Sequence, residues 1–203
     1  MITINKHSSI KIDNLYFDPF EIEKEMHDAK IVFVTHDHYD HFSPEDIEKV
    51  MNNETILVCP SSCEKAVRKA GLSLKNIVLM NPNDFMEIEG VKVTAIHSYN
   101  VGKLFHPKRN KWLGYLVELD GTTYYVPGDM DENEDALNVK CDVAFLPIGG
   151  TYTMNAKEAA KFANKMRPKV AIPIHYGSVV GKGVKGTDFS QYVDKEIEVK
   201  IFI

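Results

Sequence analysis

The sequence predicts a mixed α/β (α+β) fold in which two β-sheets pack face to face with helices outside them. Apolar runs typical of short strands outnumber the helical segments, and the helical segments each have one apolar face. No repeat, low-complexity tract or Gly/Ser-rich linker divides the chain. Two packed sheets with outer helices would bury the apolar faces of both kinds of element. We therefore expect residues 1–203 to form one domain.

The first part of the chain combines strands with two helices. Ser43-Pro44 followed by two acidic residues is typical of a helix start, and this helix is expected to end near Met51. The run Ser61-Ser62-Cys63-Glu64 has the pattern of a capping box and predicts a second helix that ends at Gly71. The strands expected here are residues 1–6, Ile31–Val34, Thr55–Cys59 and Ile77–Met80.

The second part contains two hairpins and then alternating strands and helices. The hairpin turns are expected at Glu89-Gly90 and at Asp120-Gly121, and the second dipeptide suits a type I′ turn. Asn155 can cap an amphipathic helix over Ala156–Met166. The strands expected here are Phe85–Ile88, Val91–Ile96, Trp112–Leu119, Thr122–Val126, Cys141–Pro147, Val170–Ile174 and Glu198–Ile203.

Composition narrows the classes of function. The net charge of −5 and the isoelectric point near 5.9 disfavour a general nucleic-acid binder. No apolar run reaches the roughly 20 residues of a membrane span, and the N-terminal residues lack the profile of a signal peptide. Cys59, Cys63 and Cys141 are odd in number and fit no zinc module, and Cys59 is expected to be a buried free thiol. These features favour a cytoplasmic protein with no membrane partner.

The segment Thr35-His36-Asp37-His38-Tyr39-Asp40-His41 is the most informative part of the sequence. In an extended chain His36 and His38 share a face, and Asp40 and His41 follow where a turn can direct them to a second point. Imidazole and carboxylate groups suit a borderline divalent cation such as Zn²⁺, Mn²⁺ or Fe²⁺. Chance would produce three histidines and one aspartate at these offsets in on the order of one sequence in a thousand of this composition.

Three further polar residues stand at the ends of expected strands, where loops commonly build sites. They are His97, Asp129 and His175. Each alone would be read as a buried structural histidine or a capping aspartate. Their repeated placement beside a four-residue metal motif favours one shared site.

This residue series resembles the metallo-β-lactamase superfamily, whose signature is H-x-H-x-D-H followed by a distant His, Asp and His. The resemblance implies a four-layer αββα sandwich, in agreement with the expected elements. It also implies two divalent metal ions, zinc first and manganese or iron as alternatives. One ion would be held by His36, His38 and His97, the other by Asp40, His41 and His175, with Asp129 bridging them. His106 is the rival to His97, which we prefer because a strand end fixes its position.

Within the superfamily the chain looks like the branch of L-ascorbate-6-phosphate lactonase and the phospholipase D that hydrolyses N-acyl phosphatidylethanolamines. The matching segments are His36-Asp37-His38-Tyr39-Asp40-His41, Gly128-Asp129, Leu146-Pro147-Ile148-Gly149-Gly150 and Ile174-His175-Tyr176-Gly177. The long N-terminal extension of the lipid enzyme is absent from this sequence. The branch resemblance leaves the substrate open.

The expected function is that of a dinuclear metallohydrolase in which a bridging hydroxide cleaves a phosphodiester or a lactone. The centre would be locally positive and would take an anionic small molecule. Asp40, Asp129 and His106 are the candidate catalytic residues, with His106 as substrate contact or proton donor. The alternatives are a non-catalytic metal-binding or sensing protein and a nuclease.

Two further features have open interpretations. A basic stretch could bind the anionic part of the substrate or could be an ordinary solvated loop; it contains Lys103, His106, Lys108, Arg109 and Lys111. His7 could contact the site or make a structural hydrogen bond. Pairing into a homo-oligomer is possible for such folds.

Overall fold

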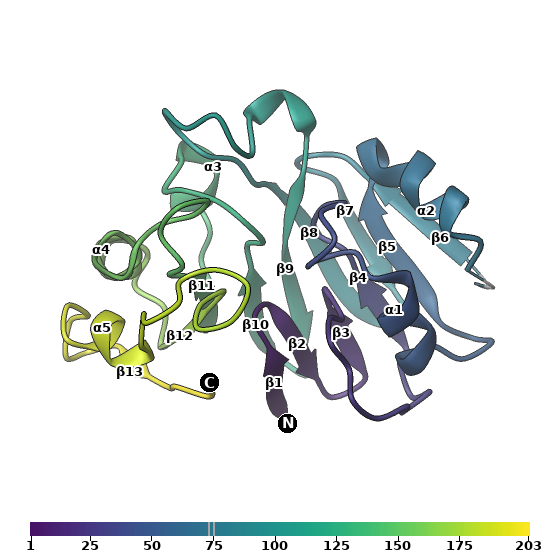
Figure 1. Ribbon diagram of the computed structural model, residues 1–203, viewed down its shortest axis with the longest axis horizontal. Helices are drawn as coiled ribbons and strands as arrows, with labels where there is room; N and C mark the ends of the chain where they lie inside the picture. Colours follow the sequence, from purple (N-terminus) through teal and green to yellow (C-terminus); the bar gives the residue numbers. More distant parts are fainter. Residues whose placement is uncertain (73, 75) are drawn as a thin grey trace. The chain divides into compact units, whose positions relative to one another are not determined.

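The computed structural model describes residues 1–72, 74 and 76–203, and it contains two compact units, each built on one sheet (Figure 1). The first unit is Met1–Asn81 and the second is Pro82–Ile203. The single domain that the sequence predicts stays a prediction, because compactness within each unit does not test it.

In the first unit, the described residues form a six-stranded sheet whose strands follow the order of the sequence. β1, β2 and β3 are antiparallel, whereas β3, β4, β5 and β6 run parallel, so the carboxyl ends of these four lie at one edge. The strands are β1 (Ile2–Lys6), β2 (Ser9–Ile12), β3 (Leu15–Phe17), β4 (Ile31–Phe33), β5 (Ile56–Pro60) and β6 (Asn76–Met80). The short strands β2 and β3 were not expected from the sequence.

Two α-helices and one 3₁₀ turn accompany this sheet: α1 (Pro44–Val50), η1 (Ser61–Cys63) and α2 (Glu64–Ala70). Ser43 caps α1 by accepting a hydrogen bond from the backbone of Asp46, as expected. The predicted capping box at residues 61–64 is wrong, because this run forms η1 and Ser61 Oγ donates to the carbonyl oxygen of Met80. Gly71 ends α2 with a left-handed φ of 71°, as expected.

An apolar cluster holds the helices of the first unit on its sheet. Ile47 and Val50 of α1 and Val67 of α2 are buried in the same cluster as Val32 of β4 and Leu57 of β5. Burying such side chains contributes about 1.5–3 kcal/mol each. The loop after β4 is therefore fixed at both ends, by a central strand and by a packed helix.

In the second unit, the described residues form a seven-stranded sheet in the order β13-β12-β11-β10-β9-β8-β7. β7 to β10 are antiparallel neighbours and β10 to β13 are parallel. The strands are β7 (Phe85–Ile88), β8 (Val91–His97), β9 (Leu113–Leu119), β10 (Thr122–Val126), β11 (Val143–Pro147), β12 (Val170–Ile174) and β13 (Glu198–Val199). The last expected strand is too long, because residues 200–203 are not part of β13.

The helices of this unit are α3 (Glu134–Leu137), α4 (Ala156–Met166) and α5 (Gly186–Ser190), with a 3₁₀ turn η2 (Lys108–Asn110). Asn155 and Glu158 form a capping box at the start of α4, which confirms the expected cap. The apolar face of α4, including Phe162, is buried in the cluster that also contains Leu146 of β11 and Ala171 of β12. Among the described residues no helix has the length and apolar character needed to cross a membrane.

Candidate metal centre

The metal motif lies in the loop that joins β4 to α1 in the first unit. Because β4 is a central parallel strand, this loop leaves the sheet at the edge where the carboxyl ends of its neighbours also lie. A turn then forms, in which the backbone N–H groups of His41 and Phe42 both donate to the carbonyl oxygen of His38. His36, Asp40 and His41 are buried. The loop thus gathers polar side chains that water does not reach freely.

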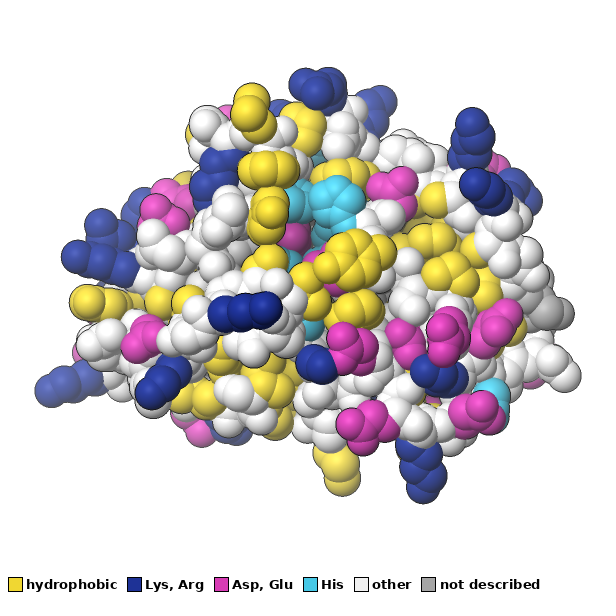
Figure 2. All heavy atoms as spheres, in the orientation of Figure 1, with side chains coloured by type: hydrophobic (Ala, Val, Ile, Leu, Met, Phe, Trp, Pro, Cys, Tyr) yellow, Lys and Arg dark blue, Asp and Glu magenta, His cyan; other side chains and the backbone are white. Residues whose placement is uncertain are grey.

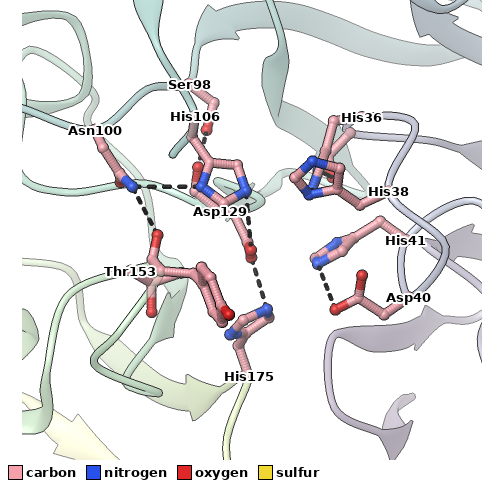
Figure 3. A network of polar contacts seen from close by, with 12 residues as sticks. His36, His38, Asp40, His41, Ser98, Asn100, His106, Asp129, Thr153 and His175 are labelled. Carbon is pink, nitrogen blue, oxygen red and sulfur yellow. Dashed lines mark hydrogen bonds and ion pairs between the residues drawn. The ribbon is translucent and has the colours of Figure 1, made fainter. Parts of the chain in front are cut away.

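The histidines of the motif bring ring nitrogens together, as Figure 3 shows. Nε2 of His36 lies 3.0 Å from Nδ1 of His38. The ring centroids of His36 and His41 are 4.1 Å apart. Nε2 of His41 lies 3.7 Å from a carboxylate oxygen of Asp40. This set of imidazole and carboxylate donors is the kind that binds borderline divalent cations.

Asp18, at the end of β3, sets the orientation of two of these histidines. Its carboxylate accepts hydrogen bonds from the backbone N–H of Thr35 at 2.8 Å, from the Thr35 hydroxyl at 2.6 Å and from Nδ1 of His41 at 2.7 Å. Since the Thr35 hydroxyl gives its proton to Asp18, it accepts from Nδ1 of His36, 3.0 Å away. Both histidines then carry the Nδ1–H tautomer, in which Nε2 is the ring atom with the lone pair.

His7, the residue after β1, also contacts this group. Its side chain is fully buried, and its Nε2 lies 3.2 Å from Oδ2 of Asp40. One donor atom each of His7, Asp40 and His41 lies within 4.8 Å of the others. This hydrogen bond places His7 against the motif, and it fits both interpretations that the sequence left open, contact with the site and a structural hydrogen bond.

In the second unit, Asp129 and His175 follow strands of the parallel part of the sheet. Asp129 comes after β10 and His175 directly after β12, and β11 lies between these strands. Their shared sheet edge places Nε2 of His175 2.9 Å from Oδ1 of Asp129 (Figure 3). Both side chains are buried. The structure therefore brings these two strand-end residues into contact, while their role as metal ligands stays a prediction.

The structure brings His106, and not His97, to Asp129. Nε2 of His106 lies 3.3 Å from Oδ2 of Asp129, and its side chain is buried. Nε2 of His97 instead contacts the carbonyl oxygen of Lys108 at 2.9 Å. Burial lowers the pKa of His97, although this hydrogen bond opposes the shift. The preference for His97 as a ligand stays a prediction, and the contact between His106 and Asp129 is the observation that favours His106 in the proposal below.

Two cations of the basic stretch between β8 and β9, Lys103 and Lys108, form ion pairs within the second unit. Lys103 contacts Asp131 at 2.5 Å, and Lys108 contacts Glu134 at 2.9 Å. Hydrogen bonds from Lys108 to Glu134 and to the Tyr99 hydroxyl raise the pKa of the Lys108 ammonium. These ion pairs favour a structural role for both lysines over the binding of a substrate anion.

Sequence reasoning did not identify Asp18, Ser98, Asn100 or Thr35 as supports of the candidate site. Ser98 donates to the carbonyl oxygen of Asp129, and Asn100 Nδ2 lies 3.3 Å from Nδ1 of His106. Asp18 directly follows the three-residue strand β3, which the sequence did not predict, so the strand-end argument that identified Asp129 and His175 could not identify it. The other supports have no comparable signal in the sequence.

The chain matches the family described as the beta-lactamase superfamily domain over residues 2–175. A UPF0173 metal-dependent hydrolase of Pyrococcus furiosus is 30% identical over 98% of this chain and 95% of its own length. A UPF0173 metal-dependent hydrolase of Methanopyrus kandleri is 31% identical over 74% of this chain and 68% of its own length.

Solved structures agree with this match. A protein from Parabacteroides distasonis superimposes with a TM-score of 0.81 at 28% identity, covering 98% of this chain and 91% of its own. Igni18, a metallo hydrolase from Ignicoccus hospitalis, has a TM-score of 0.78 at 19% identity over 98% and 93% of the two chains, which shows a shared fold. The mixed α/β fold class with two sheets that the sequence predicts is confirmed.

The chain belongs to the UPF0173 metal-dependent hydrolase family of the metallo-β-lactamase superfamily. Membership agrees with the chemistry of its donors, which are imidazole nitrogens and carboxylate oxygens gathered at the carboxyl edges of both sheets.

Proposed function

We propose that this protein is a hydrolase with two divalent metal ions, zinc first and manganese or iron as alternatives. It cleaves an ester-type bond, a phosphodiester or a lactone, in an anionic small molecule. The observation that carries the proposal is the arrangement around Asp18, which directs the Nδ1–H groups of His36 and His41 toward Thr35 and Asp18 and so makes Nε2 the lone-pair atom of each ring. A lactone or phosphodiester substrate rests on the resemblance of the sequence to the lactonase and phospholipase branch.

The proposed ligands are those that the resemblance implies, with His106 in the place first given to His97. They are His36, His38, Asp40, His41, His106, Asp129 and His175. Bound there, divalent ions would act as Lewis acids toward the scissile group and lower the pKa of water to about 7. The family membership supports this set, as does the burial of all of its members except His38.

The chain's own residues supply positioning and proton transfer. His7 holds Oδ2 of Asp40, which is the proposed atom that moves a proton to or from the reacting group. Asp129 is held between His106 and His175 through its two carboxylate oxygens, and Ser98 fixes its backbone. The buried positions of these groups strengthen their electrostatic interactions with a bound anion.

A small molecule is favoured over a nucleic acid as the substrate. Figure 2 shows Lys and Arg side chains scattered among acidic ones on the face in view, rather than gathered in a basic stripe. Lys103 and Lys108, two of the cations near His106 in the sequence, are paired with carboxylates. A polyanion would need several unpaired cations along its backbone.

The test is metal-dependent turnover. The protein is stripped with a chelator, reloaded separately with Zn²⁺, Mn²⁺ and Fe²⁺, and assayed with bis-p-nitrophenyl phosphate and a panel of phosphorylated and unsubstituted lactones. We expect activity that returns with metal and falls at least about a hundredfold in Asp129→Asn and in Asp40→Asn. Asp37→Asn, an exposed neighbour in the same loop, is the matched control and should keep its activity. Turnover that chelation leaves unchanged, in a protein that binds no metal, would contradict the proposal.

A further inference from the structure

The segment between Asn100 and His106 is a closed and anchored loop of the second unit. The backbone N–H of Asn100 donates to the carbonyl oxygen of His106 at 2.8 Å, which joins the two ends of the loop. The Asn100 side-chain amide donates to the carbonyl oxygen of Tyr152 at 2.7 Å. A third anchor is the backbone N–H of Val101, which donates to Asp131 at 3.3 Å. The loop is thus held in one shape beside His106.

The single cation of this loop is directed into its anchoring contacts. Lys103 Nζ contacts Asp131 at 2.5 Å and donates to the carbonyl oxygen of Thr153 at 2.6 Å. An ammonium group with a carboxylate and a carbonyl as partners offers little attraction to a substrate anion. The loop therefore presents no unbalanced charge.

The loop exposes apolar side chains instead. Val101 is 60% exposed, Leu104 is 94% exposed and Phe105 is 46% exposed. The Phe105 ring lies edge-on to the Tyr152 ring, with the centroids 4.6 Å apart, which limits its freedom. Three exposed apolar side chains within five residues, on a loop that hydrogen bonds hold in place, are typical of a binding surface.

We propose that Val101, Leu104 and Phe105, which we name the apolar tip, bind the apolar, non-reacting part of the substrate. The inference rests on the proposed function, since it makes the substrate an amphiphile with an anionic ester-type group and an alkyl or aromatic part. The occupant follows from chain continuity, because Phe105 is bonded directly to His106, which contacts Asp129. A substrate whose reacting group lies at His106 has its remaining atoms within reach of the tip.

The size of the effect follows from the hydrophobic free energy of a methylene group. Complete burial of each added methylene would strengthen binding about fourfold. The tip covers one side of a chain, so we expect about twofold per methylene. Over six methylenes this amounts to on the order of fiftyfold, which is easily measured.

The test is a binding series with n-alkyl phosphonates from ethyl to octyl, kept below their micellar concentrations, on the metal-loaded protein. Trp112 is the only tryptophan of the chain and its ring lies 5.4 Å from that of His106, so its fluorescence reports binding. The dissociation constant should fall about twofold per methylene. In Leu104→Ser and Phe105→Ser the dependence on chain length should largely disappear, while ethyl phosphonate binds as before. The matched control is Phe85→Ser, which removes a 63% exposed ring from β7 and should keep the full dependence.

Each outcome distinguishes this inference from the proposed function. Equal affinities along the series, or a series unchanged in both tip variants, would overturn the inference while hydrolysis of short substrates still supports the function. If longer phosphonates bind more tightly but the protein hydrolyses no phosphodiester or lactone, the proposed function is refuted and the binding role of the apolar tip is supported. Sedimentation velocity adds a further outcome: a wild-type dimer that both tip variants turn into monomers would make the tip a self-association surface and overturn the inference.

Discussion

At the scale of single residues, buried histidines are held in a strained backbone conformation. His7, His106 and His175 have φ values of 59°, 53° and 58°. The left-handed region costs a non-glycine residue roughly 1–2 kcal/mol. All three side chains are also buried beside carboxylates. Such strain persists where the surrounding contacts fix the residue, and it commonly marks functional sites.

The role of Asp18 can be tested by Asp18→Asn. An amide cannot accept from Thr35 and His41 as the carboxylate does, so the two histidines that we propose as metal ligands, His36 and His41, lose their fixed tautomer. We expect about a 10–100-fold weaker affinity for Zn²⁺, measured by competition with a chromophoric chelator. In ¹⁵N NMR spectra the signal of the His41 Nδ1–H should weaken or shift.

The matched control is Asp28→Asn, which changes another bonded carboxylate of the same unit. Asp28 accepts from Lys11 and from the Tyr16 hydroxyl, each at 2.6 Å. Its Zn²⁺ affinity should equal that of the wild type. If Asp18→Asn also binds Zn²⁺ normally, Asp18 has only a structural role.

At the scale of elements, the site residues of the second unit depend on how closely the strand ends approach one another. Gly149 follows β11, and a Cβ atom there would lie 2.5 Å from the carbonyl oxygen of His175 and 3.1 Å from its Nδ1. No rearrangement of a side chain removes a clash with backbone. Gly149 is therefore required for the backbone conformation that positions His175.

Gly149→Ala should displace His175 and weaken both stability and metal binding. We expect a loss of about 1–3 kcal/mol in the free energy of unfolding, measured in urea, together with a lower affinity for Zn²⁺. Gly71→Ala is the control: it strains the left-handed end of α2, where a Cβ meets nothing within 4 Å. It should cost about 1 kcal/mol and leave Zn²⁺ affinity unchanged. Normal Zn²⁺ binding by Gly149→Ala would show that His175 tolerates the displacement or is not a ligand.

The parallel part of this sheet also contains a pH-dependent contact. Lys169, which precedes β12, and then the backbone and hydroxyl of Thr123 in β10 hold the pKa of Asp142 well below its ordinary value of 3.8. A carboxyl group with a lowered pKa in the folded state stabilises the fold fully above its ordinary pKa. This stabilisation is lost as the pH falls from that value through the lowered one.

Asp142→Asn should therefore be less stable than the wild type at pH 7, and the difference should shrink only below about pH 4. Urea unfolding at a series of pH values from 7 to 3 measures this. Glu87→Gln, an exposed carboxylate of β7, should show no such pH-dependent difference. A difference that stays constant over the whole series would mean that packing, and not ionisation, makes Asp142 stabilising.

At the scale of the whole molecule, the sequence predicted the elements with strong periodicity and missed the short ones. The buried run at β4 and the capped helix α4 were expected, because apolar pattern and capping residues are local signals. The three-residue strand β3 and the four-residue helix α3 depend on tertiary packing and have too few residues for a periodic signal. The capping box at Ser61 failed because the carbonyl oxygen of Met80, which is distant in the sequence, takes the hydroxyl proton.

In the candidate site, too, residues placed by local sequence signals could be predicted, whereas those placed by contacts between distant residues could not. The motif from His36 to His41 and the strand-end residues Asp129 and His175 could be identified from the sequence, because position along a strand decides where they lie. The choice between His97 and His106 could not be made from the sequence. It depends on a hydrogen bond to the carbonyl oxygen of Lys108 and on a left-handed residue in a loop, and neither leaves a pattern in the sequence.

The central claim is that a divalent metal binds this protein through His106 and not through His97. The most direct measurement is the zinc content and the zinc-induced rise in melting temperature of the wild type, His97→Ala and His106→Ala, after chelation and reloading. At a hundredfold excess of free zinc over its dissociation constant, the wild type should gain about 2.7 kcal/mol of stability. We predict that His97→Ala keeps the wild-type zinc content and most of this gain, whereas His106→Ala loses at least one ion and most of the gain. Full zinc content in His106→Ala together with loss of zinc in His97→Ala would contradict the account.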